Sequence, residues 1–318
     1  MTDPRIHMAL RNHLYKSIYQ AREDGLDTLA DAMMADAIKE GIWKLPRQTP
    51  TLYFDELAAT PVHDPANFWF VELLEKNADA IRQEVGEVTD RFESGFKPVN
   101  EKIYEGTWDQ IFLYLDGRRY DDNCSHFPVL AGIIDQIEEV TSMAHGCAIL
   151  SWIQPGTKVT PHCGPTNARL RCHMGIQIPD GARIRILDDW MAWEEGKCLV
   201  FDDSFEHEVI HDGDEPRIIL LLDFWHPDAT PEIQDIASSQ KRDDRTPAQK
   251  LTQRLQGSGI KKIALSADGA ELSVTLKSAL AEDIKTSMAQ QGLGVVGLND
   301  DGELEVTPRL LALLQGMS

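Results

Sequence analysis

The first third of the chain has the apolar spacing of helices. Apolar residues recur three and four positions apart over residues 3–41, interrupted by "EDG" at 23–25, which predicts two helices. The same spacing returns at 68–88, and the proline-rich segment 45–65 between them predicts an irregular connection. We therefore expect residues 1–100 to form a helical region that packs on a core.

From about residue 105 the pattern changes to short apolar runs separated by Gly, Pro and Asp. Such runs, without helical periods between them, are typical of an all-β sandwich or barrel. We therefore expect a mainly β domain over residues 101–228. The runs lie at 108–117, 146–156, 170–181, 182–190, 198–204 and 207–225.

The C-terminal quarter has weaker signals. Residues 229–254 are rich in Asp, Ser, Lys and Gln and predict a polar linker. Residues 255–318 mix two strand-like runs with helix-like ones, which predicts a small α/β module. The module carries no recognisable chemistry, so it is either a packing appendage or a means of forming a homo-oligomer.

Charge and composition narrow the classes of partner. The chain of 318 residues has 31 basic and 52 acidic residues, a net charge of −21, which argues against binding to nucleic acid or to an anionic membrane. Its five cysteines contain no CxxC pair, so neither a disulfide framework nor a structural zinc site is indicated. No apolar run is long enough for a membrane span, and the start lacks a signal-peptide core, so we expect a cytoplasmic protein.

The segment "PHCGPTNARLRCHMG", residues 161–175, is unusually polar for a strand region. Alternate residues of a strand face one side, so Arg169, Arg171 and His173 should share a face. Buried cations are costly unless they are paired. This face is therefore either a solvated, charged surface or the lining of a site.

Four histidines fall within fifty residues of this strand-rich sequence: His162, His173, His207 and His211. Neutral imidazole is the commonest metal ligand in proteins, although a single histidine is more often a satisfied core or surface residue. His207 follows an apolar strand and an acidic bend, which is how cupin-type barrels present a metal ligand at the barrel mouth.

Arg217 begins the aliphatic strand that follows the turn "DGDEP". In an antiparallel hairpin it would lie about 7–10 Å beyond His207, a spacing that suits a five-carbon dicarboxylate bound to a metal at one end. A cation before five aliphatic residues is a poor structural choice unless it binds an anion; the alternative is an edge arginine in water.

A non-heme iron oxygenase usually has two histidines and a carboxylate, the carboxylate two residues after the first histidine. That position is Gly164 here, so the usual H-x-D motif is missing.

Three segments, in order, resemble the catalytic domain of the aspartyl/asparaginyl β-hydroxylases: "PHCGPTNARLRCHMGIQIP", "WEEGKCLVFDDSFEHEV" and "DFWHP". "GTWDQIFLYLDGRR" resembles the segment before that domain, so the resemblance covers about residues 100–228. It implies a double-stranded β-helix, a jelly-roll of cupin-like fold. It also implies Fe(II) as cofactor and 2-oxoglutarate as cosubstrate.

The resemblance assigns His162 and His207 as the two iron ligands, with water in place of a third protein ligand. Gly164 agrees with that arrangement. By the same resemblance His173 is a cosubstrate contact and no third ligand. His211 is expected to be a solvated turn residue without a role.

The resemblance also assigns the remaining pocket residues. Arg217 would pair with the distal carboxylate of 2-oxoglutarate, and Arg171 would line the cosubstrate and substrate pocket. The further cosubstrate contacts are Ser151 and His173, and the positions near the substrate are Arg169 and Trp108.

These residues predict a 2-oxoglutarate-dependent dioxygenase that hydroxylates an unactivated C–H bond. The expected position is the β-carbon of an aspartyl, asparaginyl or related carboxylate-bearing substrate, as a small molecule, a peptide or a carrier-bound group. Two alternatives remain: a halogenase that uses the place of the missing carboxylate, and a cupin-like binding or sensor protein without activity.

Overall fold

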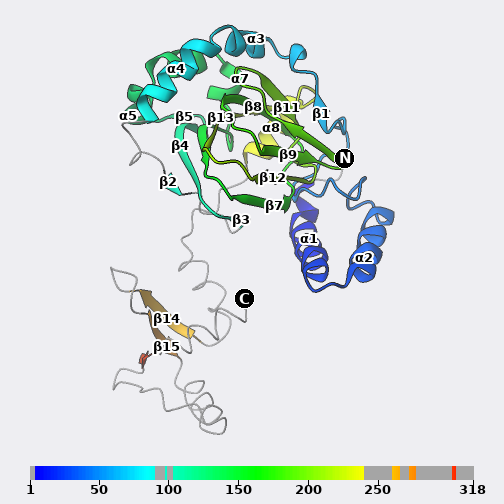
Figure 1. Cartoon of the computed structure of the whole chain (residues 1–318). Helices are drawn as coiled ribbons and strands as arrows, with labels where there is room; N and C mark the ends of the chain where they lie inside the picture. Colours follow the sequence, from blue (N-terminus) through cyan, green and yellow to red (C-terminus); the bar gives the residue numbers. More distant parts are fainter. Residues whose placement is uncertain are drawn as a thin grey trace. The chain divides into compact units, whose positions relative to one another are not determined.

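The structure is a computed structural model that describes residues 4–89, 97–98, 103–239, 260–265, 272–276 and 303–305. The chain divides into two compact units, Met1–Lys241 and Arg242–Ser318. Each unit is described by itself below, and Figure 1 shows the course of the chain.

Helices occupy the N-terminal part of the first unit and part of its middle. They are η1 (Pro4–His7), α1 (Met8–Glu23), α2 (Asp27–Lys39), η2 (Pro65–Asn67), α3 (Trp69–Lys76), α4 (Ala78–Thr89), α5 (Asp121–His126), α6 (Pro128–Ile134), α7 (Glu138–Thr141) and α8 (Pro231–Ser238).

Strands make up the rest of the first unit. They are β1 (Val62–His63), β2 (Lys97–Pro98), β3 (Tyr104–Glu105), β4 (Trp108–Leu115), β5 (Arg118–Arg119), β6 (Cys147–Ile153), β7 (Lys158–His162), β8 (Arg169–Gln177), β9 (Ala182–Ile186), β10 (Asp189–Ala192), β11 (Cys198–Phe201), β12 (His207–His211) and β13 (Arg217–Trp225).

The strands form two antiparallel sheets. The major sheet has the order β1-β11-β8-β13-β6-β4-β2, with β5 paired to β4, and the minor sheet has the order β10-β9-β12-β7-β3. Ile149 and Ile219 of the major sheet pack in one apolar cluster with Ile184 and Val209 of the minor sheet, so the two sheets face each other. The predicted jelly-roll core with N-terminal helices is therefore confirmed.

The position of β13 explains why its sequence is almost continuously aliphatic. Ile219 and Leu221 point into the space between the sheets, whereas Leu220 and Leu222 point to the opposite face, which packs on Phe70, Leu74, Ile81 and Leu130 of the helices. A strand buried on both faces needs apolar residues at every position. Figure 1 shows α3 and α4 lying over this side of the sheets.

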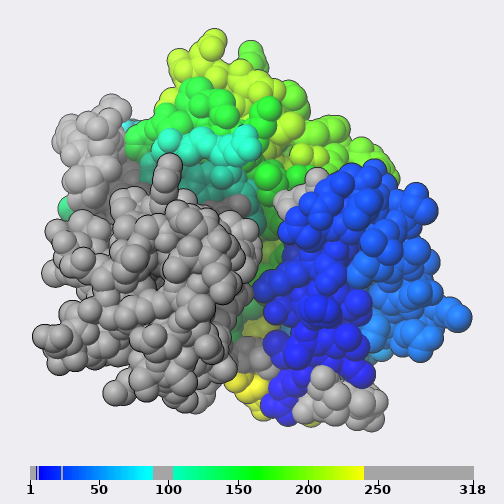
Figure 2. All heavy atoms as spheres, turned by 90° about the horizontal axis from the view of Figure 1, so that it is seen from below, coloured from blue at the N-terminus to red at the C-terminus, as the bar shows by residue number. Residues whose placement is uncertain are grey.

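The N-terminal helices follow the predicted spacing. α1 and α2 form a hairpin whose turn contains Gly25 at φ +73°, in the "EDG" break. Ala30, Met34 and Trp43 form a small apolar core between the helices and the chain after them. This hairpin, blue in Figure 2, forms a lobe of the first unit on the face shown there.

Three expectations about connections are wrong. Residues 121–141 form α5, α6 and α7, although the sequence predicted strands without helices between them. β12 and β13 do not form a hairpin, because the turn after His211 carries the chain from the minor to the major sheet. The first part of the predicted polar linker is α8, capped by the Thr230 side chain and anchored by buried Ile233 and Ala237.

In the second unit, β14 (Ile260–Leu265), β15 (Leu272–Leu276) and β16 (Glu303–Glu305) form an antiparallel sheet in that order. The helix-like runs predicted for residues 255–318 lie outside the described residues. Within the described parts of both units, no helix has the length and apolarity needed to cross a bilayer.

We expect Leu220→Ala to lower the free energy of unfolding by about 2–5 kcal/mol, because Leu220 is fully buried in the central strand β13. The matched control is Leu29→Ala on the exposed side of α2, where Leu29 is 51% exposed and the change should be within about 0.5 kcal/mol. Urea unfolding of both variants checks this. Equal losses would contradict the assignment of β13 as the shared core strand.

Candidate active site

His162 and His207 lie side by side at one end of the minor sheet. His162 is the last residue of β7 and His207 the first of β12, and the two are directly paired across the antiparallel ladder. Their ring centroids are 4.2 Å apart. The pairing of β7 with β12 thus places the two imidazoles close enough for one ion to contact both.

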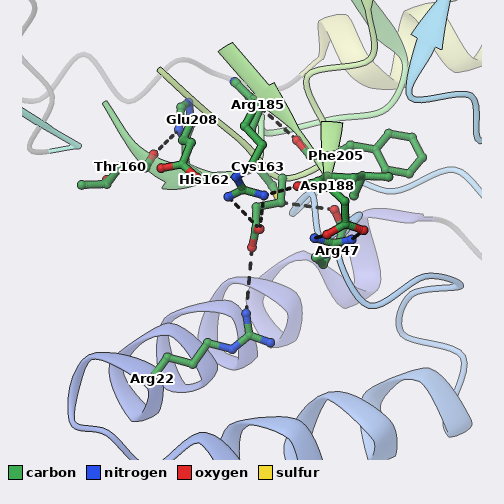
Figure 3. A network of polar contacts seen from close by, with 12 residues as sticks. Arg22, Arg47, Thr160, His162, Cys163, Arg185, Asp188, Phe205 and Glu208 are labelled. Atoms are coloured by element: carbon green, nitrogen blue, oxygen red, sulfur yellow. Dashed lines mark hydrogen bonds and ion pairs between the residues drawn. The ribbon is translucent and has the colours of Figure 1, made fainter. Parts of the chain in front are cut away.

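Each imidazole has its tautomer fixed by a backbone carbonyl. His162 Nδ1 lies 2.8 Å from the carbonyl oxygen of Thr160, and His207 Nδ1 lies 2.9 Å from that of Phe205 (His162 and Thr160 are shown in Figure 3). A carbonyl only accepts, so Nδ1 carries the proton and the lone pair is on Nε2. Burial, together with neighbouring His162, lowers the pKa of His207 to about 3, so this ring is neutral at neutral pH.

Within the described residues, no group of three or more His, Cys, Asp or Glu side chains is arranged to hold a metal ion. At the position of the missing carboxylate, a Cβ added to Gly164 would lie 2.5–2.6 Å from the carboxylate atoms of Asp203. The Gly164 N–H also donates to the Asp203 backbone carbonyl. The place of the H-x-D side chain is therefore filled by a carboxylate from another segment of the chain.

Asp203 is part of a buried cluster of two arginines and two aspartates. Arg169 lies 3.1 Å from Asp203 and 3.3 Å from Asp223, and Arg171 lies 3.1 and 3.0 Å from the same two carboxylates. Burial alone would raise the pKa of Asp203, but Arg169 and Arg171 outweigh it and hold that pKa below its usual value. The cluster thus pairs two guanidinium groups with two carboxylates.

Arg217 is the buried cation without a counter-charge. It is 2% exposed, its guanidinium lies 4.7 Å from the centre of the Trp193 ring, and its Nε and Nη1 have no hydrogen-bond partner. No carboxylate in the described part of the chain forms an ion pair with it, and burial lowers the pKa of Arg217 to about 9. An unpaired buried guanidinium is costly, so this position calls for an anionic ligand.

A row of aromatic rings connects Arg217 to the histidine pair. Trp193 packs against His173, His173 against Phe201 at 4.9 Å, and Phe201 against His207 at 5.5 Å between ring centres. Trp193 Nε1 donates to His173 Nδ1 at 3.3 Å, which puts the His173 proton on Nε2. That buried N–H has no acceptor, so it is a second donor that can bind a ligand.

Ser151 and Trp108 come from the neighbouring strands β6 and β4. The Trp108 indole N–H donates to Ser151 Oγ at 2.9 Å, and Ser151 is 1% exposed. Because its oxygen accepts from Trp108, the Ser151 hydroxyl proton is directed elsewhere. Ile219 of β13 is the partner of Ser151 across the ladder.

The structure brings most of the expected residues together. Arg169, Arg171 and His173 do share one face of β8, because Leu170, Cys172 and Met174 between them pack on the helices. His211 was expected to be a solvated turn residue, and this is wrong: it is fully buried, and its Nε2 lies 2.7 Å from the Glu215 carbonyl oxygen.

Sequence reasoning missed four residues of the site: Asp203, Asp223, Trp193 and Phe201. Asp203 stands in the acidic bend before His207, and Asp223 interrupts the aliphatic run of β13. A buried strand tolerates a carboxylate only when a cation pairs with it, so Asp223 was a usable signal. The two aromatic residues carry no signal that separates them from ordinary core residues.

Comparison with known proteins agrees with these features. The family model described as aspartyl/asparaginyl β-hydroxylase matches residues 75–227. The chain is 41% identical to the aspartyl/asparaginyl beta-hydroxylase of Homo sapiens over 181 residues, 55% of this chain and 24% of that protein. It is 34% identical to aspartate beta-hydroxylase domain-containing protein 2 of Mus musculus over 189 residues, 57% of this chain and 55% of that protein.

The matched part thus spans between a quarter and about half of the length of these relatives. It contains the strands that carry His162 and His207, the Arg169–Asp203 ion pair and Arg217. Residues 75–227 are thus the part of the chain that is similar to the aspartyl/asparaginyl β-hydroxylase family.

Proposed function

We propose that this chain is an Fe(II)- and 2-oxoglutarate-dependent dioxygenase that hydroxylates an unactivated C–H bond. One observation carries the proposal: the adjacent rings of His162 and His207 are connected by a row of aromatic rings to a buried arginine that forms no ion pair in the described part of the chain. The two histidines suit a divalent metal, and Arg217 suits an anion that also reaches the metal.

His162 and His207 are the residues that would hold the iron. Both present the Nε2 lone pair, and both are oriented through Nδ1 by a carbonyl, as metal-binding imidazoles commonly are. His173 is unsuited to be a third ligand, because its Nδ1 accepts from Trp193 and its Nε2 carries the proton.

The donors at the other end suit 2-oxoglutarate. Arg217 offers Nε and Nη1 to the distal carboxylate, and the His173 Nε2–H and the Ser151 hydroxyl offer further hydrogen bonds. Burial strengthens each of these interactions, because it excludes water from the carboxylate and from the guanidinium.

Bound iron and 2-oxoglutarate would supply the chemistry: O₂ is consumed, 2-oxoglutarate is split to succinate and CO₂, and the substrate C–H becomes C–OH. The chain positions these groups and keeps water out. Asp203 Oδ1 is buried without a partner next to Gly164, so it can accept a hydrogen bond from water bound beside the histidines. Its carboxylate occupies the place beside Gly164 that a halide would take, which supports hydroxylation over halogenation.

For the substrate we propose an aspartyl, asparaginyl or related carboxylate-bearing group, following the names of the relatives. Trp108, Arg169 and Arg171 are the proposed contacts. The charges of Arg169 and Arg171 are already balanced by Asp203 and Asp223, so their contribution to recognition is directed hydrogen bonding more than net charge.

Succinate release in the presence of aspartate, asparagine, peptides containing them and acyl substrates tests the proposal. A product 16 mass units heavier in chloride buffer indicates hydroxylation, whereas a chlorinated product would indicate a halogenase. Absence of succinate with every substrate class, although Fe(II) and 2-oxoglutarate are bound, would favour a binding or sensor protein.

His162→Ala and His207→Ala should each abolish tight binding of Fe(II) or Mn(II), because two imidazoles are the whole proposed protein ligand set. The loss of the free Mn(II) signal in electron paramagnetic resonance measures binding without turnover. His211→Ala, outside the ring pair, is the control. A variant that keeps wild-type affinity removes that histidine from the ligand set.

Arg217→Lys should raise the KM for 2-oxoglutarate, because lysine keeps the charge but lacks the planar fork that pairs with a carboxylate. Arg217→Ala should raise it further, by the equivalent of about 2–5 kcal/mol, because the distal carboxylate would be buried without a partner. Mn(II) affinity should change little in both. Cosubstrate titration decides the matter: an unchanged KM with wild-type turnover would contradict the assignment.

Gly164→Asp should lower the free energy of unfolding by about 1–3 kcal/mol, because the new side chain meets the carboxylate of Asp203. The double variant Gly164→Asp, Asp203→Gly should recover part of the loss, since one carboxylate again faces the arginines. Thermal unfolding of the two variants and of wild type in a chelator measures this. Wild-type stability of Gly164→Asp would show that Asp203 does not fill this place.

A further inference from the structure

Residues 47–54, which we call the clasp, run along the outside of the two segments that carry the histidines. The sequence predicted only an irregular, proline-rich connection here. The family model begins at residue 75, so the clasp lies outside the part of the chain that the family defines.

On one side the clasp holds the segment that ends in His207. The Glu206 N–H donates to the Arg47 carbonyl at 2.7 Å, and Gln48 pairs with Phe205 as an antiparallel bridge. The fully buried Gln48 amide donates to Asp202 Oδ2 at 3.2 Å and to Ser204 Oγ at 3.0 Å. Contacts to Asp202, Ser204 and Glu206 therefore fix the bend just before His207.

On the other side the clasp holds the segment that follows His162. The Thr49 hydroxyl donates to Cys163 Sγ at 3.2 Å, and the Leu52 N–H donates to the Pro165 carbonyl at 3.0 Å. Asn167 is 2% exposed, and its amide both accepts from the N–H of Phe54 and donates to the Phe54 carbonyl, each at 2.9 Å.

Helix α1 reinforces the same two points. The Tyr19 hydroxyl donates to Glu206 at 3.4 Å and lies 4.0 Å from Cys163 Sγ, so it touches the residue next to each histidine. Arg22 adds an ion pair to Glu206 at 3.9 Å. Figure 3 shows Arg22 reaching from the helix toward the strands, with Arg47 against Asp188 beside it.

The ladder between β7 and β12 is irregular where the histidines sit. The register shifts between His207 and Val209, immediately after the His162–His207 pair. A bulge locally disrupts the hydrogen bonds that set strand spacing. The clasp supplies hydrogen bonds to the residues just before His207 and just after His162, next to this irregular point.

We propose that the clasp sets the spacing of the two ligand histidines, with Gln48 of the clasp and Asn167, which binds Phe54 of the clasp, as the positioning residues. The proposal rests on the proposed function, since it concerns the affinity of the His162–His207 pair for a divalent metal. Gln48 acts on the His207 segment and Asn167 on the His162 segment, so the two residues can be tested independently.

Mn(II) binding by the full chain, without 2-oxoglutarate or substrate, is the measurement. Gln48→Met keeps the side-chain volume but removes both amide donors, and Asn167→Asp replaces the one donor that faces the Phe54 carbonyl with an acceptor. Each should weaken Mn(II) binding about tenfold, the size typical of lost outer-shell support. Gln48→Asn, which keeps the amide on a shorter side chain, should recover part of the affinity.

Tyr114→Phe is the matched control, because it removes a partly buried side-chain hydrogen bond to Asp135 that belongs to neither ligand segment. Its Mn(II) affinity should equal that of wild type even where its unfolding temperature falls as far as that of Gln48→Met. Wild-type affinity in both clasp variants, or the same loss in Tyr114→Phe, would overturn the clasp's role. Failure of wild type itself to bind Mn(II) would instead refute the proposed function.

Should Gln48→Met fold poorly, Asn167→Asp decides alone, since it changes a single side-chain atom and retains the bond from the Phe54 N–H.

Discussion

The constraint on which the site depends is the uneven filling of the space between the two sheets. Ile184, Val209, Ile219 and Leu221 fill part of it with apolar side chains. Polar groups lie around them: Arg217 at one end of β13, the arginine–aspartate pairs at the Asp223 end, and the His162–His207 pair on the minor sheet. Buried polar groups are costly in a protein interior, so the apolar side chains supply the stability that lets the polar groups leave donors unsatisfied.

Charge in this region is divided between balanced and unbalanced groups. Asp203 and Asp223 each form ion pairs with both Arg169 and Arg171, so these ion pairs fix the side chains along this part of β8. Arg217 has only the face of Trp193. The residue that we propose for binding the cosubstrate is therefore the one that forms no ion pair in the described part of the chain, whereas the paired arginines hold Asp203 next to Gly164.

Sequence patterns predicted the parts of the site that depend on local order. The alternation of Arg169, Arg171 and His173 along β8 follows from strand geometry, and His162, His207 and Arg217 stand in recognisable motifs. The predictions that failed concern how segments distant in the sequence are arranged. A turn such as "DGDEP" looks the same whether it closes a hairpin or crosses between sheets, so the place of Arg217 could not be derived from it. β7 was missed because its last residues, Thr160, Pro161 and His162, are not typical of a strand interior.

The burial of β13 on both faces has a consequence for how the first unit unfolds. Leu220 and Leu222 belong to the core under the helices, and Ile219 and Leu221 belong to the core between the sheets, so one strand is a wall of both. Neither core can open while β13 stays in place with its neighbours β6 and β8. The helical layer over the major sheet and the space between the sheets are thus coupled, and we expect the amides of β13 to exchange with solvent only when both of these cores open.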